Sequence, residues 1–137
     1  MLHFLNTDDI KNICFQYAET YLSYDEPIPC FESRYADKLD AILAMPQQMI
    51  SNKFLYPTLP DQAAVLFYEM IKQHPLLNGN KRIACVALMV FLSLNGKWMN
   101  TGWKNLYDIA VTVASSQTDN RGGVLNLLVQ FLAANIV

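Results

Sequence analysis

Apolar residues recur at intervals of three and four along most of this chain, and that spacing is typical of helices that bury one face. The clearest case begins after a predicted N-cap at Thr7, where apolar side chains from Ile10 to Leu22 fall on one face. No segment is rich in strand-like alternation, and no internal repeat is visible. The sequence therefore predicts an all-α fold, a helical bundle with its core between packed helices.

Capping residues and helix breakers set the limits of the predicted helices. Thr58 to Asp61 has the form of a capping box, and His74-Pro75 ends the helix that it opens. The following helix is apolar on nearly all sides, which predicts a central position, and Asn95-Gly96 supplies a left-handed cap. A turn is predicted at 120–123, before a last helix with one apolar stripe. Helices are expected over residues 7–22, 35–43, 58–73, 80–94, 106–113 and 124–132.

Length and composition narrow the class of protein. The 137 residues fit a single domain over 1–137, and 53% of them are hydrophobic against 16% charged, which excludes extended disorder. A net charge of -2 argues against direct nucleic-acid binding, which requires a basic surface. The longest apolar run, Ile83 to Leu94, is far shorter than the roughly 20 residues of a membrane span. With no secretion signal visible and three cysteines read as reduced thiols, a cytoplasmic location is expected.

Polar residues gather in the stretch that joins the two most apolar helices. Gly79 allows a sharp turn there, and the amides of Asn80, Lys81 and Arg82 would project from the start of the next helix. Cations in a first turn oppose the helix dipole unless an anion is bound among them. The pattern favours a phosphate held by these residues, with His74 close enough to act as general base for an incoming hydroxyl. The alternative is that His74 caps the preceding helix and that Lys81 and Arg82 are solvated surface charges.

The nine residues His-Pro-Leu-Leu-Asn-Gly-Asn-Lys-Arg, from His74 to Arg82, resemble the signature of the Fic/Doc superfamily, HxFx(D/E/N)(G/A)N(G/K)R. The order of helices around them and the section from Pro29 to Pro46 look like the Doc branch, so the resemblance covers nearly the whole chain. It implies that His74 is the catalytic base and that Gly79, Asn80, Lys81 and Arg82 bind the phosphates of a nucleotide.

Lys81 is the residue that distinguishes the branches of that family. Fic adenylyltransferases carry glycine at this position, whereas Doc toxins carry lysine and transfer the terminal phosphate. Cys85 stands where a second Fic arginine is usual, which also favours Doc. The resemblance thus implies a toxin of a toxin-antitoxin system that uses ATP and Mg²⁺ to phosphorylate a protein hydroxyl, with elongation factor Tu as the family's known target, and so blocks translation. The alternatives are a Fic-type adenylyltransferase and a catalytically lapsed binding module.

Two positions depart from the family signature. Leu76 replaces the usual phenylalanine that anchors the loop, and Asn78 replaces the usual acid that holds magnesium. Asparagine offers one neutral oxygen, so the metal would depend on nucleotide phosphates and water.

The family also has a target-aligning flap, which corresponds here to the loop or short hairpin expected between Gln47 and Leu59. Asn52, Lys53 and Phe54 are its candidate contacts. No inhibitory helix motif is recognisable, so a separate antitoxin is the expected restraint.

Overall fold

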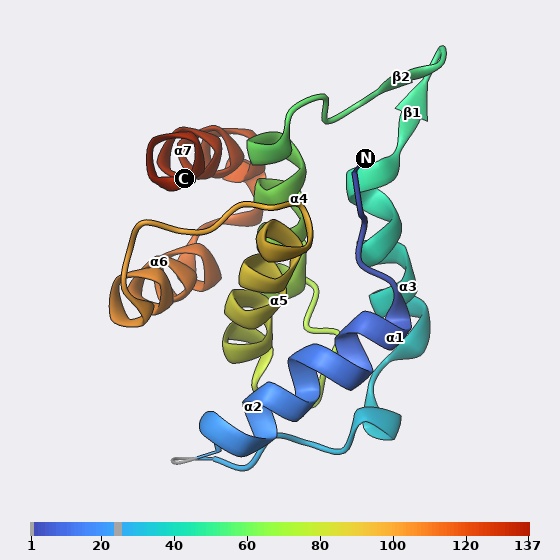
Figure 1. Cartoon of the computed structure of the whole chain (residues 1–137), viewed down its shortest axis with the longest axis vertical. Helices are drawn as coiled ribbons and strands as arrows, with labels where there is room; N and C mark the ends of the chain where they lie inside the picture. The colour runs from blue at the N-terminus through green and yellow to red at the C-terminus, as the bar shows by residue number, and fades with distance from the viewer. Residues whose placement is uncertain (1, 24–25) are drawn as a thin grey trace.

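The computed structural model describes residues 2–23 and 26–137, and within these it is helical with one short hairpin, as the all-α prediction requires (Figure 1). The helices are α1 (Thr7–Asp9), η1 (Ile10–Phe15), α2 (Gln16–Tyr21), η2 (Phe31–Ser33), α3 (Ala36–Ala44), η3 (Met45–Gln47), α4 (Leu59–Lys72), α5 (Asn80–Leu94), α6 (Trp103–Ser115), η4 (Thr118–Asn120) and α7 (Arg121–Asn135). The strands are β1 (Met49–Ile50) and β2 (Lys53–Phe54). The predicted first helix is present as α1, η1 and α2 without a break, although Asn6 and not Thr7 is its N-cap.

Helix α5 occupies the centre of the bundle, as its apolar character predicts. It packs against α4, α6 and the η1–α2 helix, which surround it in Figure 1. Most of its side chains are buried, and among the buried residues of α5 only Asn80 and Arg82, both in the first turn, are polar. Gly96 has φ +74° just after the helix, which confirms the predicted left-handed cap. The apolar centre therefore begins directly at the motif residues.

Helix α4 delivers the chain to the motif. Thr58 and Asp61 form the predicted capping box at its start, with Thr58 Oγ1 accepting a hydrogen bond from the Asp61 amide at 3.2 Å. From Gln62 to Ile71 its residues are all buried, because α5, α7 and η3 pack around it. A helix of 14 residues spans about 21 Å, so α4 separates the segment before it from the loop after it by that length.

The C-terminal part of the sequence prediction was wrong in two respects. Arg121 begins α7, so Gly122 and Gly123 lie in a helical first turn and not in a connecting turn. The predicted apolar stripe is only partly covered, since Leu128 and Leu132 are buried while Leu127 is 67% exposed. The helix lies at the edge of the bundle, where α4 covers one side of it and no further layer follows (Figure 1).

The thiols are free, as the sequence predicted. Cys14 and Cys85 are buried in the core, and burial raises the pKa of each to about 12, so both remain protonated at neutral pH. Cys30 is exposed and lies outside the helices. Within the described residues, no helix combines the length and apolarity needed to cross a membrane.

Candidate functional site

The motif loop is shaped by two residues in left-handed backbone conformation. His74 has φ +50° and Gly79 has φ +73°, so the chain reverses direction at both ends of the loop. Glycine tolerates this region freely, whereas a histidine there is strained. A side chain at Gly79 would also approach Arg82 Nη2 to 3.2 Å and Ile28 Cδ1 to 3.3 Å. The loop between them is short: its Leu76 anchor is buried, while His74, Leu77 and Asn78 are exposed.

Asn80 closes the loop from within. Its Oδ1 accepts a hydrogen bond from the Leu76 amide at 3.0 Å, and its Nδ2 donates to the Leu76 carbonyl at 3.1 Å. Both ends of the amide side chain are thus used inside the protein, and Asn80 is only 9% exposed. The structure therefore gives Asn80 a role in fixing the motif loop to the start of α5.

We expect Asn80→Asp to lower the free energy of unfolding by about 2 kcal/mol, because the carboxylate cannot donate to the Leu76 carbonyl. Urea unfolding followed by circular dichroism measures the change. Asn78→Asp is the matched control, since Asn78 is exposed and lies in the same loop. Equal stability of the two variants would contradict the structural role of Asn80.

Arg82 is buried, so the surface-charge alternative is wrong for this residue. It is 7% exposed, and its Nη1 donates to the carbonyls of Leu22 and Glu26, each at 2.6 Å. The Glu26 carboxylate lies 3.9 Å from Nη2. The guanidinium is therefore held between the start of α5 and the segment that follows α2, with Nη2 beside Gly79.

The start of α5 presents backbone amides that have no acceptor recorded among the described residues. The Ile83 amide donates to the Gly79 carbonyl at 2.9 Å, and the amides of residues 80–82 have no acceptor within the described part of the chain. Lys81, half-buried, is the second cation there, and no acidic residue stands in the first turn. The start of α5 therefore joins the positive end of the helix dipole to two cations, and the carboxylate recorded beside them in the described residues is that of Glu26, 3.9 Å from Arg82 Nη2. Such a surplus of positive charge suits an oxyanion.

The start of α3 and the residue before it contact the other side of the loop. The Tyr35 amide donates to the Pro75 carbonyl at 2.8 Å, and Lys38 Nζ donates to the Gln73 carbonyl at 3.3 Å. His74 is thus fixed between two backbone contacts while its own side chain is exposed. An exposed imidazole on a rigid backbone can exchange a proton with an approaching hydroxyl.

The hairpin that contains the predicted flap residues lies elsewhere. Strands β1 and β2 pair Met49 with Phe54 and Ile50 with Lys53, around a turn at Ser51 and Asn52 with φ +52° and +64°. Figure 1 shows the hairpin projecting at the upper end of the molecule, whereas the yellow-green start of α5 lies at the lower end. The contact recorded for Phe54 is with the ring of Phe4, at 5.8 Å. The structure does not bring Asn52, Lys53 and Phe54 together with His74.

The described residues do not form a protein-held magnesium site. They contain no group of three or more His, Cys, Asp or Glu side chains arranged to hold a metal. Asn78 is exposed and brings a single neutral carbonyl oxygen. Magnesium at this loop would therefore depend on the phosphates of a nucleotide substrate and on water.

Comparison with known proteins places the chain in a family. The model described as Fic/DOC family matches residues 4–92, which includes the motif loop and most of α5. The chain belongs to the Fic/DOC family. Toxin Doc of Mycolicibacterium smegmatis is 43% identical to it over 58 residues, a segment that covers 42% of this chain and 45% of the relative. The match thus spans less than half of the curated protein. None of the solved structures matches the chain.

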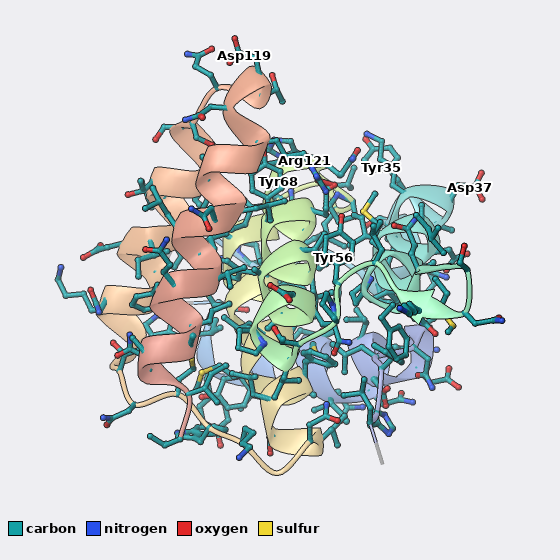
Figure 2. All side chains as sticks on the ribbon, turned by 90° about the horizontal axis from the view of Figure 1, so that it is seen from above. Tyr35, Asp37, Tyr56, Tyr68, Asp119 and Arg121 are labelled. Carbon is teal, nitrogen blue, oxygen red and sulfur yellow. The ribbon has the colours of Figure 1, made fainter. Side chains whose placement is uncertain are left out.

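A second polar cluster, which sequence reasoning missed, lies along α4. Buried Glu69 forms an ion pair with Arg121, whose Nε lies 3.5 Å from Glu69 Oε1, and it accepts a hydrogen bond from Gln73 Nε2 at 3.3 Å. Arg121 Nη2 also donates to Tyr56 Oη at 3.4 Å, and Figure 2 shows Arg121 next to Tyr68 at the start of α7. Gln73 directly precedes His74, so the cluster adjoins the motif loop. Its members are 65 residues apart at most, and the sequence pattern gave no sign that the fold would join them.

Proposed function

We propose that this protein is a Doc-like toxin that transfers the terminal phosphate of ATP to a hydroxyl of a protein target. The observation that carries the proposal is the start of α5, where unassigned amides, Lys81 and buried Arg82 follow a left-handed glycine. Family membership and the identity to Toxin Doc support it. Lys81 favours phosphate transfer over nucleotidyl transfer, because the signature of the adenylyltransferase branch has glycine there.

Each motif residue then has a separate task. Gly79 lets the phosphate approach the backbone, while Lys81 and the α5 amides neutralise its charge. Arg82 Nη2, which points along Gly79, adds a second cationic donor. Asn80 keeps the loop closed through Leu76 and so acts on phosphate through the backbone that it positions. His74 accepts the proton of the target hydroxyl as the phosphorus-oxygen bond forms and the adenosine diphosphate leaves.

The partners follow from the same proposal. Elongation factor Tu is the proposed target, so that phosphorylation blocks translation in the cytoplasm, and the hairpin around Asn52, Lys53 and Phe54 is the proposed contact with it. Exposed apolar side chains on both strands, Met49, Ile50 and Phe54, suit pairing with an extended segment. A separate antitoxin is the proposed restraint. A single domain over residues 1–137 is part of the same proposal.

Radiolabelled ATP tests the reaction directly. The protein is incubated with magnesium, elongation factor Tu and ATP labelled at either the terminal or the first phosphate, and the labelled protein is counted. Terminal label on the target is the expected result. Label from the first phosphate on the target would identify an adenylyltransferase instead of a kinase. If neither label is found on elongation factor Tu, that protein is not the target.

A lapsed module that binds without turnover is the second candidate, and two observations favour it. Arg82 Nη1 is already occupied by two backbone carbonyls, and Asn78 lacks the usual charge. Asn78→Asp separates the candidates. A working kinase is expected to change transfer by less than about tenfold, because the nucleotide brings most magnesium ligands itself. Activity that appears only in the variant would establish the lapsed module.

A further inference from the structure

His74 has a backbone conformation that its own neighbours in sequence do not favour. Gln73 is the C-cap of α4, so His74 is the residue after the cap, where left-handed backbone is usual and glycine is the common residue. Such a turn is often closed by the amide of the following residue, but that residue is Pro75, which has no amide hydrogen. A residue before proline also prefers an extended backbone with negative φ. Contacts from other parts of the fold must therefore hold His74 at φ +50°.

The His74 amide does not provide that support. Within residues 2–23 and 26–137, no hydrogen bond is recorded from it. The residues on either side are held instead. The Pro75 carbonyl accepts from the Tyr35 amide at 2.8 Å, and Gln73 makes a larger set of bonds on the other side.

Gln73 is bonded at three of its polar groups. Its amide donates to the Glu69 carbonyl at 3.0 Å, which continues the bonding pattern of α4 by one residue. Its side chain adds a second bond to the same residue, since Nε2 donates to Glu69 Oε2 at 3.3 Å. Its carbonyl accepts from Lys38 Nζ, also at 3.3 Å. The side chain of Gln73 is therefore bonded to an anion, and the peptide group that leads into His74 is bonded to a cation.

Both charged partners belong to a wider set of contacts. The Glu69 side chain is 5% exposed, and its Oε1 lies 3.5 Å from Nε of Arg121, the first residue of α7. A buried carboxylate that loses a partner is strongly penalised, so Glu69 keeps Gln73 in place. Lys38 belongs to α3. Helices α3, α4 and α7 thus converge on the residue before His74.

We propose that Gln73 is a positioning residue for His74, and that Glu69 and Lys38 act through it. Their bonds keep His74 in the left-handed backbone, so that the exposed imidazole stays at the edge of the loop where a target hydroxyl arrives. None of the three contacts phosphate or hydroxyl, so their loss slows transfer without weakening nucleotide binding. The inference rests on the proposed role of His74 as general base. The competing explanation is that the same bonds only cap the end of α4.

Gln73→Met tests the inference, because it removes the side-chain donor and keeps the length of the side chain. His74 should then relax toward the extended backbone that Pro75 favours, which raises the three-bond coupling between its amide and α protons in nuclear magnetic resonance spectra. We expect kcat for terminal-phosphate transfer to elongation factor Tu to fall about tenfold, while KM for ATP stays within about twofold. Lys38→Met removes the donor to the Gln73 carbonyl and should change the coupling and kcat in the same direction.

Lys97→Met is the matched control. Lys97 is exposed, and its side chain makes no recorded bond within the described part of the chain. Its loss should leave the His74 coupling, kcat and KM at their wild-type values.

The outcomes separate this inference from its competitor and from the proposed function. An unchanged coupling in both Gln73→Met and Lys38→Met would overturn it, because His74 would then be held by other contacts. A coupling that rises while kcat stays at the wild-type value would contradict a role in the reaction, and a lower urea midpoint with neither change would identify a helix cap. Failure of the proposed function looks different: the wild-type protein then transfers no label, and the coupling alone decides whether Gln73 holds His74.

Discussion

Replacing His74 by glycine is expected to abolish transfer while making the protein slightly more stable. The imidazole is the only general base that the proposed reaction has, and loss of such a base lowers the rate by at least about 100-fold. The backbone of His74 has φ +50°, which costs a non-glycine residue about 1 kcal/mol. Glycine relieves that strain, so the free energy of unfolding should rise by about 0.5 kcal/mol. Terminal-phosphate transfer and urea unfolding, measured on the same preparation, check both parts.

His74→Ala and His74→Asn are the matched controls for this prediction. Alanine keeps the strained backbone, whereas asparagine tolerates it, and neither can act as a base at neutral pH. Both should lose transfer, and only asparagine should share in the added stability. Wild-type transfer by any of the three would exclude His74 as the base. A strained residue that is exposed and makes no recorded side-chain hydrogen bond within the described chain is better explained by function than by packing.

The fold could be predicted from the sequence in those segments where the spacing of the apolar residues fits a helix. The spans of α4 and α5, the capping box at Thr58 and the left-handed Gly96 all follow from local rules and are present. The start of α7 was not predictable, because Asn120-Arg121-Gly122-Gly123 has the composition of a turn, whereas in the structure Arg121 begins a helix that packs against α4. The same limit applies to Tyr17 and Tyr21, which keep helical spacing but are 50% and 65% exposed and contact each other.

The candidate site shows a different limit. Residue types and spacing located the loop from His74 to Arg82, but they did not say which donors the protein uses internally. Asn80 bonds to Leu76 and Arg82 bonds to carbonyls 56 and 60 residues away, so neither contact could be seen in the motif itself. Trp98 shows a related limit, because a large aromatic side chain just after a buried helix predicts a place in the core, yet it is 51% exposed. Its backbone pairs with that of Val137, since the Trp98 amide donates to the Val137 carbonyl at 3.0 Å and the Val137 amide donates to the Trp98 carbonyl at 2.9 Å.

Arg82→Ala is expected to lower the free energy of unfolding by about 3 kcal/mol and to abolish transfer as well. Two bonds of 2.6 Å from one buried guanidinium nitrogen are lost, and a hydrogen bond to a charged group contributes about 1.5–3 kcal/mol. Lys81→Ala is the neighbouring control. No hydrogen bond or ion pair is recorded for Lys81 in the described chain, so its loss should change stability by less than about 0.5 kcal/mol while still reducing transfer. Urea unfolding of both variants measures the difference in stability. The midpoint should shift while the slope of the unfolding free energy against urea concentration stays constant.

Arg82→Lys distinguishes the structural from the catalytic part of that loss. An ammonium group can donate to the two carbonyls as a point charge, so most of the stability should return. It cannot at the same time extend a second nitrogen along Gly79, where Arg82 Nη2 lies 3.2 Å from the position of a side-chain carbon. Transfer should therefore remain at least about tenfold below wild type. Full recovery of transfer would mean that phosphate needs only a charge here, and that the fork of Arg82 serves the segment after α2 alone.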